Sequence, residues 1–339
     1  MISWPPRLSL AQLPTPVTRV ERFPDLPDGV EVWIKRDDLT GTEVSGNKVR
    51  KLEFNLAEAQ QQGCNAVITC GGVQSNHCRA TALLGARLGM KVHLLLRGEQ
   101  PQIPQGNLLL DQLAGAEITF VSEQQWPQHE AMVRELQEKF AAQNDKAYYI
   151  PVGASDEVGL WGYIAASEEI AHDIDRLSLQ PDYIVVATGS GGTQSGLLVG
   201  AKEFSLPGQV VAFNVSDNAA YFKKKVETDV ALWKQRYKTD FDLESLTVKT
   251  IEGYLGPGYG VATPEIFATI KQLASSNGII LDPVYTGKAF HGMVQELRQG
   301  RFGTTGDVIF VHTGGIFGLF PQRAEMGQPH NHAADLNSE

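Results

Sequence analysis

Apolar residues recur at two different spacings along the chain, and the spacing separates predicted strands from predicted helices. Short runs that are apolar throughout, or that alternate with polar residues, indicate strands, whereas an apolar repeat every three to four residues indicates a helix. Strands are predicted at 31–35, 66–70, 92–96, 117–121, 147–152, 183–187, 209–214, 279–281 and 307–312. Helices are predicted at about 47–62, 75–88, 107–113, 123–142, 157–174, 194–202, 264–274 and 287–298. This alternation predicts an α/β fold of parallel sheets covered by helices.

The two ends of the chain lack such periodicity. Residues 1–30 are interrupted by prolines, so we expect an irregular arm packed on the body. Residues 327–339 are polar and are expected to fray, with His330 and His332 as tail residues and not metal ligands. The chain has 339 residues, enough for two domains or one large α/β unit, and no metal site is expected.

Composition and charge exclude several kinds of partner. A net charge of -10 argues against non-specific binding to nucleic acid or to an anionic membrane. No apolar run is long enough to span a bilayer, and the start lacks a basic segment followed by an apolar one, so a cytoplasmic protein is expected. Cys64, Cys70 and Cys78 are odd in number and lack Cys-x-x-Cys spacing, which indicates reduced thiols.

Lys48 stands at the start of a predicted helix, directly after a loop marked by Gly41 and Gly46. The positive end of the helix dipole disfavours an ammonium group in the first turn. A lysine that is easily held neutral can form a Schiff base with a carbonyl group. The alternative is that Lys48 is one of several solvated basic residues in a run with Arg50 and Lys51.

A glycine-rich loop follows the predicted strand 183–187 and leads into the next helix. Glycines allow successive backbone N–H groups to converge, and the helix start adds positive dipole, so the loop suits a phosphate. Gln194 occupies the place of the third glycine of a dinucleotide fingerprint and no Walker lysine follows, so a small phosphate-bearing cofactor fits better than NAD or ATP. A tight turn that merely uses glycine is the alternative. The candidate phosphate-binding residues are Gly189, Ser190, Gly191, Gly192 and Thr193.

A second glycine-rich junction between a strand and a helix ends in Ser75, Asn76 and His77. Serine and asparagine are preferred helix N-caps, so capping alone is one explanation. An exposed helix start with these side chains also suits a carboxylate. Two helix starts that suit anions favour a ligand with a phosphate at one end and a carboxylate at the other, such as an amino acid joined to pyridoxal phosphate.

Two tyrosines and the loop after the last strand complete the candidate site. Tyr259 lies in the glycine-rich segment 256–260, and Tyr285 lies between a predicted strand and a predicted helix. Isolated tyrosines are usually core or rim residues. Residues 311–315 follow the last strand, and the ligand crevice of an open α/β sheet lies beyond the carboxyl ends of its strands.

Together these segments resemble the tryptophan-synthase-β-like (fold type II) pyridoxal-phosphate enzymes, and among them the D-cysteine desulfhydrase and 1-aminocyclopropane-1-carboxylate (ACC) deaminase family. The motifs run in the family's order over most of the chain, at 35–38, 45–54, 71–77, 189–193, 256–260, 282–288 and 312–315. The resemblance implies two open, twisted, mostly parallel sheets flanked by helices. It also implies a large domain at 1–51 and 158–339, which binds pyridoxal phosphate, and a small domain at 52–157.

The resemblance further implies roles for individual residues. Lys48 would bind the cofactor covalently and move protons, while residues 189–193 would hold the phosphate. Ser75 and Asn76 match residues that contact the substrate carboxylate and the phenolic oxygen of the cofactor, with His77 beside them. Tyr285 matches a tyrosine against the pyridine ring and Tyr259 one that faces the substrate, and either could share proton transfer with Lys48.

Thr286 and Thr313, both assigned to the cofactor site, distinguish two branches of the family. In the deaminase branch these positions hold glutamate and leucine, and the first lies near the pyridine nitrogen. A carboxylate there stabilises the protonated ring and gives the strong electron sink that opening a cyclopropane needs. A hydroxyl leaves the ring closer to neutral, which is enough for β-elimination of a good leaving group. The two threonines, of which Thr313 also faces the substrate, therefore favour the desulfhydrase branch.

The resulting hypothesis is a lyase that converts D-cysteine and water to pyruvate, hydrogen sulfide and ammonia. ACC and other β-substituted amino acids (D-serine, β-chloro-D-alanine and L-cysteate) stay open as substrates, as does a non-catalytic binding protein with this fold. The incomplete glycine fingerprint argues against a dehydrogenase. The family implies a homodimer, and Cys78 is either a small buried residue or a redox-sensitive thiol.

Overall fold

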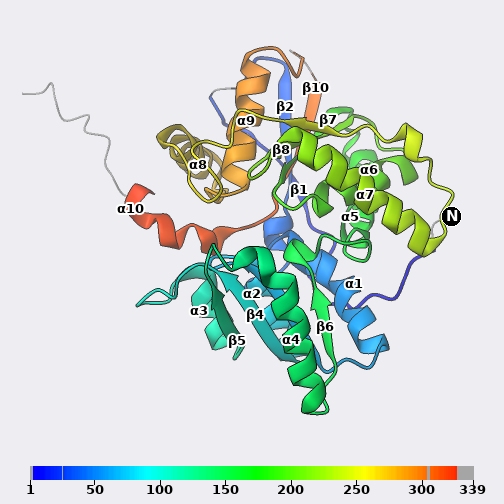
Figure 1. Cartoon of the computed structure of the whole chain (residues 1–339). Helices are drawn as coiled ribbons and strands as arrows, with labels where there is room; N and C mark the ends of the chain where they lie inside the picture. The colour runs from blue at the N-terminus through cyan, green and yellow to red at the C-terminus, as the bar shows by residue number, and fades with distance from the viewer. Residues whose placement is uncertain (1–2, 25, 304–305, 327–339) are drawn as a thin grey trace, which may run out of the picture.

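The computed structural model describes residues 3–24, 26–303 and 306–326, and the tail expected at 327–339 lies outside them. The described strands form one sheet of six strands and one of four. All neighbouring strands are parallel except the first two, which pair antiparallel. The prediction of two mostly parallel sheets flanked by helices is confirmed (Figure 1).

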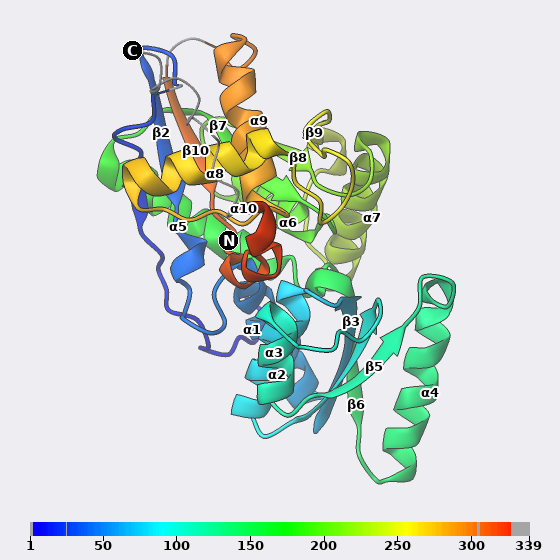
Figure 2. The same ribbon diagram turned by 90° about the vertical axis from the view of Figure 1, so that its left-hand side faces the viewer.

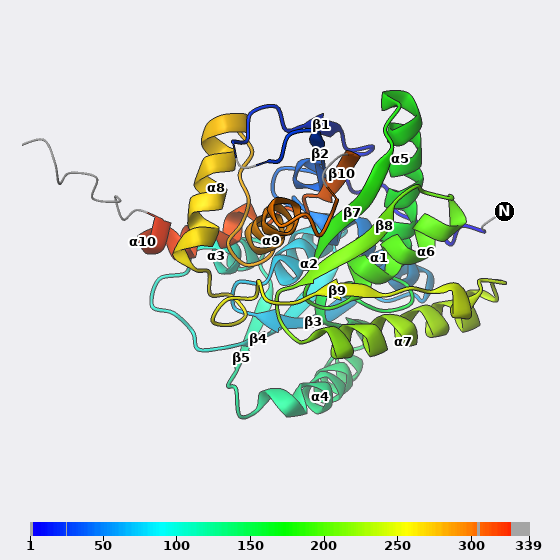
Figure 3. The same ribbon diagram turned by 90° about the horizontal axis from the view of Figure 1, so that it is seen from above.

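The larger sheet is built from both ends of the described chain. Its strands are β1 (Val17–Arg19), β2 (Val30–Lys35), β7 (Pro181–Thr188), β8 (Gln209–Asn214), β9 (Lys249–Ile251) and β10 (Gly306–Val311), in the order β1-β2-β10-β7-β8-β9. One face carries α5 (Trp161–Leu177), α6 (Gly192–Glu203) and α7 (Ala219–Tyr237), and the other carries α8 (Pro264–Asn277) and α9 (Thr286–Arg298). Figure 3 shows these two helical layers on either side of the strands.

The smaller sheet lies below the larger one in Figure 2. It contains β3 (Ala66–Gly72), β4 (Lys91–Arg97), β5 (Glu117–Val121) and β6 (Ala147–Ile150), in the order β5-β4-β3-β6. Helices α1 (Asn47–Gln61) and α2 (Asn76–Arg87) share a core with one of its faces, and α4 (His129–Ala142) packs on the other. The short helices α3 (Gly106–Leu113) and α10 (Arg323–Met326) complete the set that Figure 1 labels.

Burial on both faces explains why the central strands are continuous apolar runs. In β7, Ile184 and Val186 face the core under α5–α7, whereas Val185 and Ala187 face the core under α8 and α9. Successive side chains of a strand point to opposite faces, so a sheet covered on both sides selects apolar residues at every position.

Several sequence predictions were wrong at the level of single elements. Residues 279–281 are not a strand, and residues 147–152 form a strand only as far as Ile150. The helix predicted from 123 begins at His129, because a short 3-10 turn that contains Pro127 precedes it. Helix α7 and strands β1 and β9 were not predicted, although α7 has a clear N-cap in which Asn218 accepts a hydrogen bond from the Tyr221 N–H.

Candidate active site

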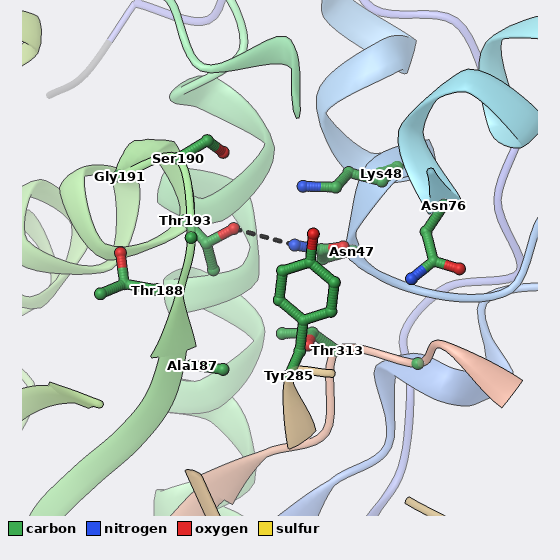
Figure 4. A pocket seen from close by; sticks show the side chains of 12 residues that line it. Asn47, Lys48, Asn76, Ala187, Thr188, Ser190, Gly191, Thr193, Tyr285 and Thr313 are labelled. Atoms are coloured by element: carbon green, nitrogen blue, oxygen red, sulfur yellow. Dashed lines mark hydrogen bonds between the residues drawn. The ribbon is translucent and has the colours of Figure 1, made fainter. Parts of the chain in front are cut away.

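A narrow pocket opens between the carboxyl ends of β7 and β10 and the first turns of α1 and α2 (Figure 4). This is where ligands bind in open α/β sheets. The pocket brings together eight residues that were predicted from sequence: Lys48, Asn76, Gly189, Ser190, Gly191, Thr193, Tyr285 and Thr313. Four further lining residues, Asn47, Ala187, Thr188 and Gly314, were not named as site residues, although Asn47 and Gly314 lie in the motif segments 45–54 and 312–315.

A wider cleft of about 730 Å³ adjoins this pocket, and five residues line both cavities: Lys48, Asn76, Gly189, Ser190 and Tyr285. The cleft adds the predicted residues Ser75, His77 and Tyr259. Its rim also contains residues that sequence reasoning did not single out, among them Arg97, Trp126, His129, Tyr149, Ser155, Tyr221 and Lys225. The two cavities together extend from the 189–193 loop to the start of α2.

Lys48 occupies the first turn of α1, as the sequence predicted, and its amine reaches Gly153. A Cβ atom added at Gly153 would lie 3.4 Å from the Lys48 Nζ atom. Burial lowers the pKa of Lys48 to about 8, against a smaller opposing effect of Cys78. A substantial fraction of the amine is therefore neutral near physiological pH. The direction agrees with the sequence argument, and the cause is burial of the amine.

The alternative of a solvated basic run at Lys48, Arg50 and Lys51 is wrong. Arg50 is fully buried, and its guanidinium pairs with Asp37 and Glu169. Lys51 is also fully buried, with its Nζ atom 3.3 Å from both the Gly153 carbonyl and the Ser155 hydroxyl. Burial, reinforced by Lys48, holds the pKa of Lys51 well below its ordinary value.

The loop after β10 packs directly on the first turn of α1. The Asn47 N–H donates to the Thr313 carbonyl at 3.1 Å. A Cβ atom at Gly46 would lie 2.6 Å from that carbonyl oxygen, and one at Gly314 would lie 2.6 Å from the Gly46 Cα atom. Both glycines also have positive φ angles, 114° and 80°. This close approach fixes the position of Lys48 relative to Thr313.

Residues 189–193 form a cradle around the first turn of α6. The first N–H groups of a helix have no acceptor within the helix, and here they point toward the pocket end of β7. The Gly192 N–H donates to the Ser155 hydroxyl at 3.2 Å, and the same hydroxyl contacts the Ser190 hydroxyl at 2.8 Å. Thr193 accepts a hydrogen bond from the Asn47 amide at 3.0 Å (Figure 4). The cradle therefore offers backbone donors and hydroxyl groups.

Lys51 places its amine beside this cradle, because the Ser155 hydroxyl that it contacts also contacts Ser190. Lys225 lies nearby, with its Nζ atom 3.2 Å from the Ser155 carbonyl, but Asp229 pairs with it at 2.5 Å. Sequence reasoning missed Lys51. Its position three residues after Lys48 on the same helix, hence on the same face, was the available signal.

The start of α2 combines capping with exposure to the cleft. Ser75 is the N-cap of α2, and its hydroxyl accepts a hydrogen bond from the Cys78 N–H at 3.1 Å, so capping explains part of its role. His77 is buried, and its Nε2 atom lies 2.7 Å from the Thr69 hydroxyl. Burial, with Lys48 and Lys51 nearby, holds the pKa of His77 well below its ordinary value, so this imidazole is neutral at pH 7.

Tyr259 and Tyr285 meet at the mouth of the pocket. Their hydroxyl oxygens are 2.5 Å apart, and their rings cross at 78°. A Cβ atom at Gly189 would lie 2.9 Å from the Tyr285 ring, so that ring covers the glycine. Burial raises the pKa of both phenols. Lys288 holds the Tyr259 loop from below by donating to the carbonyls of Leu255 at 2.6 Å and Gly258 at 2.7 Å.

Thr286 is one of two predicted site residues, with Gly192, that line neither cavity. Its hydroxyl donates to Asp282 at 2.7 Å and accepts from the Asp282 N–H at 2.9 Å. The Asp282 carboxylate also accepts from the N–H groups of Val284, Tyr285 and Thr286. Both groups are thus engaged in the turn that leads from Asp282 into α9. Gly192 does not line the pocket either, but its N–H group belongs to the cradle.

The residues present fit pyridoxal phosphate. The 189–193 cradle leaves no room for a Cβ atom at Gly192, where it would lie 2.6 Å from the Ser155 hydroxyl, and it suits a phosphate. In the same pocket Lys48 supplies a partly neutral amine, and Tyr285 supplies a flat aromatic surface. The Thr188 hydroxyl, a pocket-lining group, is buried without a partner among the described residues.

Comparison with known proteins agrees with this geometry. The sequence model of a family described as pyridoxal-phosphate dependent enzyme matches residues 8–314. The chain belongs to this family. It is 43% identical to a mitochondrial bifunctional D-cysteine desulfhydrase/1-aminocyclopropane-1-carboxylate deaminase of Arabidopsis thaliana, over 94% of this chain and 80% of that protein. It is 38% identical to a D-cysteine desulfhydrase of Klebsiella pneumoniae, over 93% of this chain and 95% of that one.

A solved structure gives the same result. The crystal structure of an ACC deaminase homologue matches with a TM-score of 0.85 and 34% identity, covering 95% of each chain. The expected family and the dependence on pyridoxal phosphate are therefore confirmed, and the chain is a pyridoxal-phosphate enzyme of the desulfhydrase and deaminase family. No helix within the described residues is long and apolar enough to cross a membrane.

Proposed function

We propose that this enzyme is a β-elimination lyase that converts D-cysteine and water to pyruvate, hydrogen sulfide and ammonia. One observation carries the choice among the family's substrates. Among the described residues that line the inner pocket there is no aspartate or glutamate. Asp282 is the acidic residue of the turn that contains Tyr285. Its carboxylate accepts hydrogen bonds from three backbone N–H groups of that turn and from the Thr286 hydroxyl.

The absence of a carboxylate from this lining bears on the chemistry. When bound, pyridoxal phosphate supplies an electron sink for the carbanion formed at Cα of an amino acid. A carboxylate at the ring nitrogen deepens that sink, whereas hydroxyl groups such as those of Thr188 and Thr313 do not. The shallower sink supports loss of a thiolate from Cβ better than opening of a cyclopropane ring.

The residues of the chain provide the remaining requirements. The Lys48 amine, with a pKa near 8, is suited to take the proton from Cα. At the start of α2, Ser75 is suited to hold the substrate carboxylate and Asn76 to contact the phenolic oxygen of the cofactor. The hydrogen-bonded hydroxyls of Tyr259 and Tyr285 lie at the mouth of the pocket, where they are suited to protonate the leaving thiolate. Water then hydrolyses the released enamine to pyruvate and ammonia.

ACC is the second candidate substrate, because the names of the Arabidopsis relative and of the solved homologue both include ACC deaminase. Other β-substituted amino acids, such as D-serine, β-chloro-D-alanine and L-cysteate, are compatible with the same elimination. Substrate choice among them depends on the leaving group and on which face of the cofactor presents the α-hydrogen.

A visible spectrum of the purified enzyme, followed by parallel incubation with D-cysteine, L-cysteine and ACC, tests the proposal. Sulfide and pyruvate from D-cysteine alone are expected. Formation of 2-oxobutyrate from ACC at a comparable kcat/KM would replace the proposal by deaminase activity. A visible band without turnover of any of these substrates would support a non-catalytic binding protein.

The remaining expectations concern assembly. We propose a cytoplasmic homodimer whose large domain comprises 1–51 and 158–339 and whose small domain comprises 52–157. The separate core that α1, α2 and the smaller sheet share supports a small domain. Light scattering of the purified enzyme at micromolar concentration should give twice the 37.0 kDa mass of the chain.

A further inference from the structure

Arg79 is a buried cation one turn into α2, directly behind Asn76. It is fully buried, and its guanidinium lies over the ring of Phe317 at 4.7 Å. Its Nη2 atom donates to the Ser45 carbonyl at 2.6 Å, and its Nη1 atom donates to the Asn107 Oδ1 atom at 2.8 Å and to the Asn76 Oδ1 atom at 3.1 Å. Arg79 therefore connects the loop before Lys48 with the start of α2 and with α3.

These contacts fix the orientation of two amide groups. A guanidinium has donors and no acceptor, so the atoms of Asn76 and Asn107 that face Arg79 must be oxygens. The nitrogen of Asn107 is then free to donate, and it does so to the Gln74 carbonyl at 2.9 Å and to the Asn76 Oδ1 atom at 3.1 Å. The Asn76 oxygen thus accepts two hydrogen bonds on its inner side.

The consequence for the pocket is that Asn76 presents its amide nitrogen. Figure 4 shows the nitrogen of this side chain on the side of Lys48 and Tyr285, with the oxygen turned away. Asn76 lines both cavities. Toward a ligand it acts only as a hydrogen-bond donor, so the ligand atom opposite must be a hydrogen-bond acceptor.

Among the described residues, no carboxylate contacts the guanidinium of Arg79 directly, and its hydrogen-bond partners are amide and carbonyl oxygens. Asp111 is the acidic residue that acts on the pKa of Arg79, but both of its oxygens are buried without a hydrogen-bond partner among the described residues. Burial raises the pKa of Asp111 to about 8, so this side chain is mostly protonated at pH 7. The positive charge of Arg79 therefore polarises the Asn76 amide toward the pocket.

We infer that Arg79 is a positioning residue that, with Asn107, sets Asn76 as an obligate donor to the ionised phenolic oxygen of the cofactor. The inference rests on the proposed placement of the cofactor, with its phosphate in the 189–193 cradle and its carbonyl carbon at Lys48. A donor at that oxygen disperses its negative charge. We expect this donor to lower the pKa of the group that Lys48 would form with the bound cofactor.

The pH dependence of the visible band of the resting holoenzyme tests this inference without substrate. In Arg79→Lys one ammonium replaces the planar fork and cannot hold three oxygens at these positions. We expect the pH midpoint of the band to rise by about one unit, which is a tenfold change in proton affinity. The reason is that Asn76 loses its charge-assisted hydrogen bond from Arg79. Asn107→Ala should raise it in the same direction. Arg87→Lys is the control, because Arg87 lies on the same helix and donates to the Leu10 carbonyl at 3.3 Å, not to Asn76.

A double-mutant cycle separates positioning from a general structural effect. Asn76→Ala should raise the midpoint by itself, and Arg79→Lys should add nothing in that background, because Arg79 acts through Asn76. A wild-type midpoint in Arg79→Lys and Asn107→Ala, or full additivity with Asn76→Ala, would overturn the inference. Asn107→Ala carries the test if Arg79→Lys does not fold. Failure of D-cysteine turnover would refute the proposed function but leave these resting spectra as a valid test.

Discussion

Replacing Asp37 by asparagine should destabilise the enzyme through the buried ionic cluster behind the Lys48 turn. Asp37 is fully buried and accepts four hydrogen bonds. Two come from Arg50 at 2.8 Å each, one from the Tyr163 hydroxyl at 2.6 Å and one from the Thr15 hydroxyl at 2.8 Å. An amide at this position keeps one acceptor oxygen but turns an NH₂ group toward donors.

The expected loss of unfolding free energy depends on which ion-pair partner Arg50 keeps. Removing one partner of a buried ion pair costs about 3–5 kcal/mol, because the other charge stays buried. Arg50 keeps its contact with Glu169 at 2.8 Å, so the lower end of the range, about 3 kcal/mol, is expected for Asp37→Asn. The matched control is Glu31→Gln, which breaks the exposed pair between Arg19 and Glu31 and should cost less than about 1 kcal/mol.

Urea unfolding at pH 7, followed by tryptophan fluorescence, provides the measurement. Trp161 and Trp233 are fully buried in the core under α5–α7 and report on this part of the chain. The midpoint of Asp37→Asn should fall while the slope stays constant. Equal midpoints for Asp37→Asn and Glu31→Gln would refute the argument that the buried pair stabilises the fold.

The buried pair of Asp37 and Arg50 also predicts that the free energy of unfolding depends on pH. Burial alone would raise the pKa of Asp37, but Arg50 and the Tyr163 hydroxyl lower it below the ordinary value of 3.8. A carboxyl whose pKa is lower in the folded chain stabilises the fold above its unfolded pKa, and this contribution is lost as the pH falls through the folded pKa. The stability difference between wild type and Asp37→Asn should therefore be constant down to about pH 5 and shrink below about pH 4.

Three further predictions concern the site itself. Lys48→Ala should lose the visible cofactor band and lower kcat/KM by roughly 10³-fold or more, and retained turnover would contradict its role. Gly192→Ala should weaken pyridoxal-phosphate binding about tenfold in equilibrium dialysis, since the added Cβ atom would lie 2.8 Å from the Ser155 backbone. Lys288→Met should lower kcat several-fold and speed proteolysis of the Tyr259 loop while leaving the cofactor band unchanged, because two carbonyls lose their donor. Unchanged proteolysis would show that Lys288 does not hold the loop.

Local sequence patterns were sufficient for most of the architecture. The strand at 209–214 and the helix start before Lys48 were predictable because period-2 and period-3.6 apolar patterns report burial directly. The loop at 189–193 and the N-cap at Ser75 were predictable because glycine and serine have local backbone effects. The prediction of a strand at 279–281 was wrong because an apolar triplet fits a buried connection as well as a strand. Helix α7 was missed although Phe222, Val226, Val230 and Trp233 repeat at helical spacing and are buried.

The sequence alone predicted the fold class, the two helix starts suited to anions and the candidate lysine, because each depends on residues near one another in the chain. Only the tertiary structure decided which polar residues share a pocket and how each is charged. Arg50 and Lys51 look solvated in sequence but are fully buried, since their partners Glu169 and Ser155 come from more than a hundred residues away. Thr286 looks like a pocket residue but bonds Asp282. The pKa of Lys48 and the orientation of Asn76 depend on burial and on long-range hydrogen bonds, which no local pattern encodes.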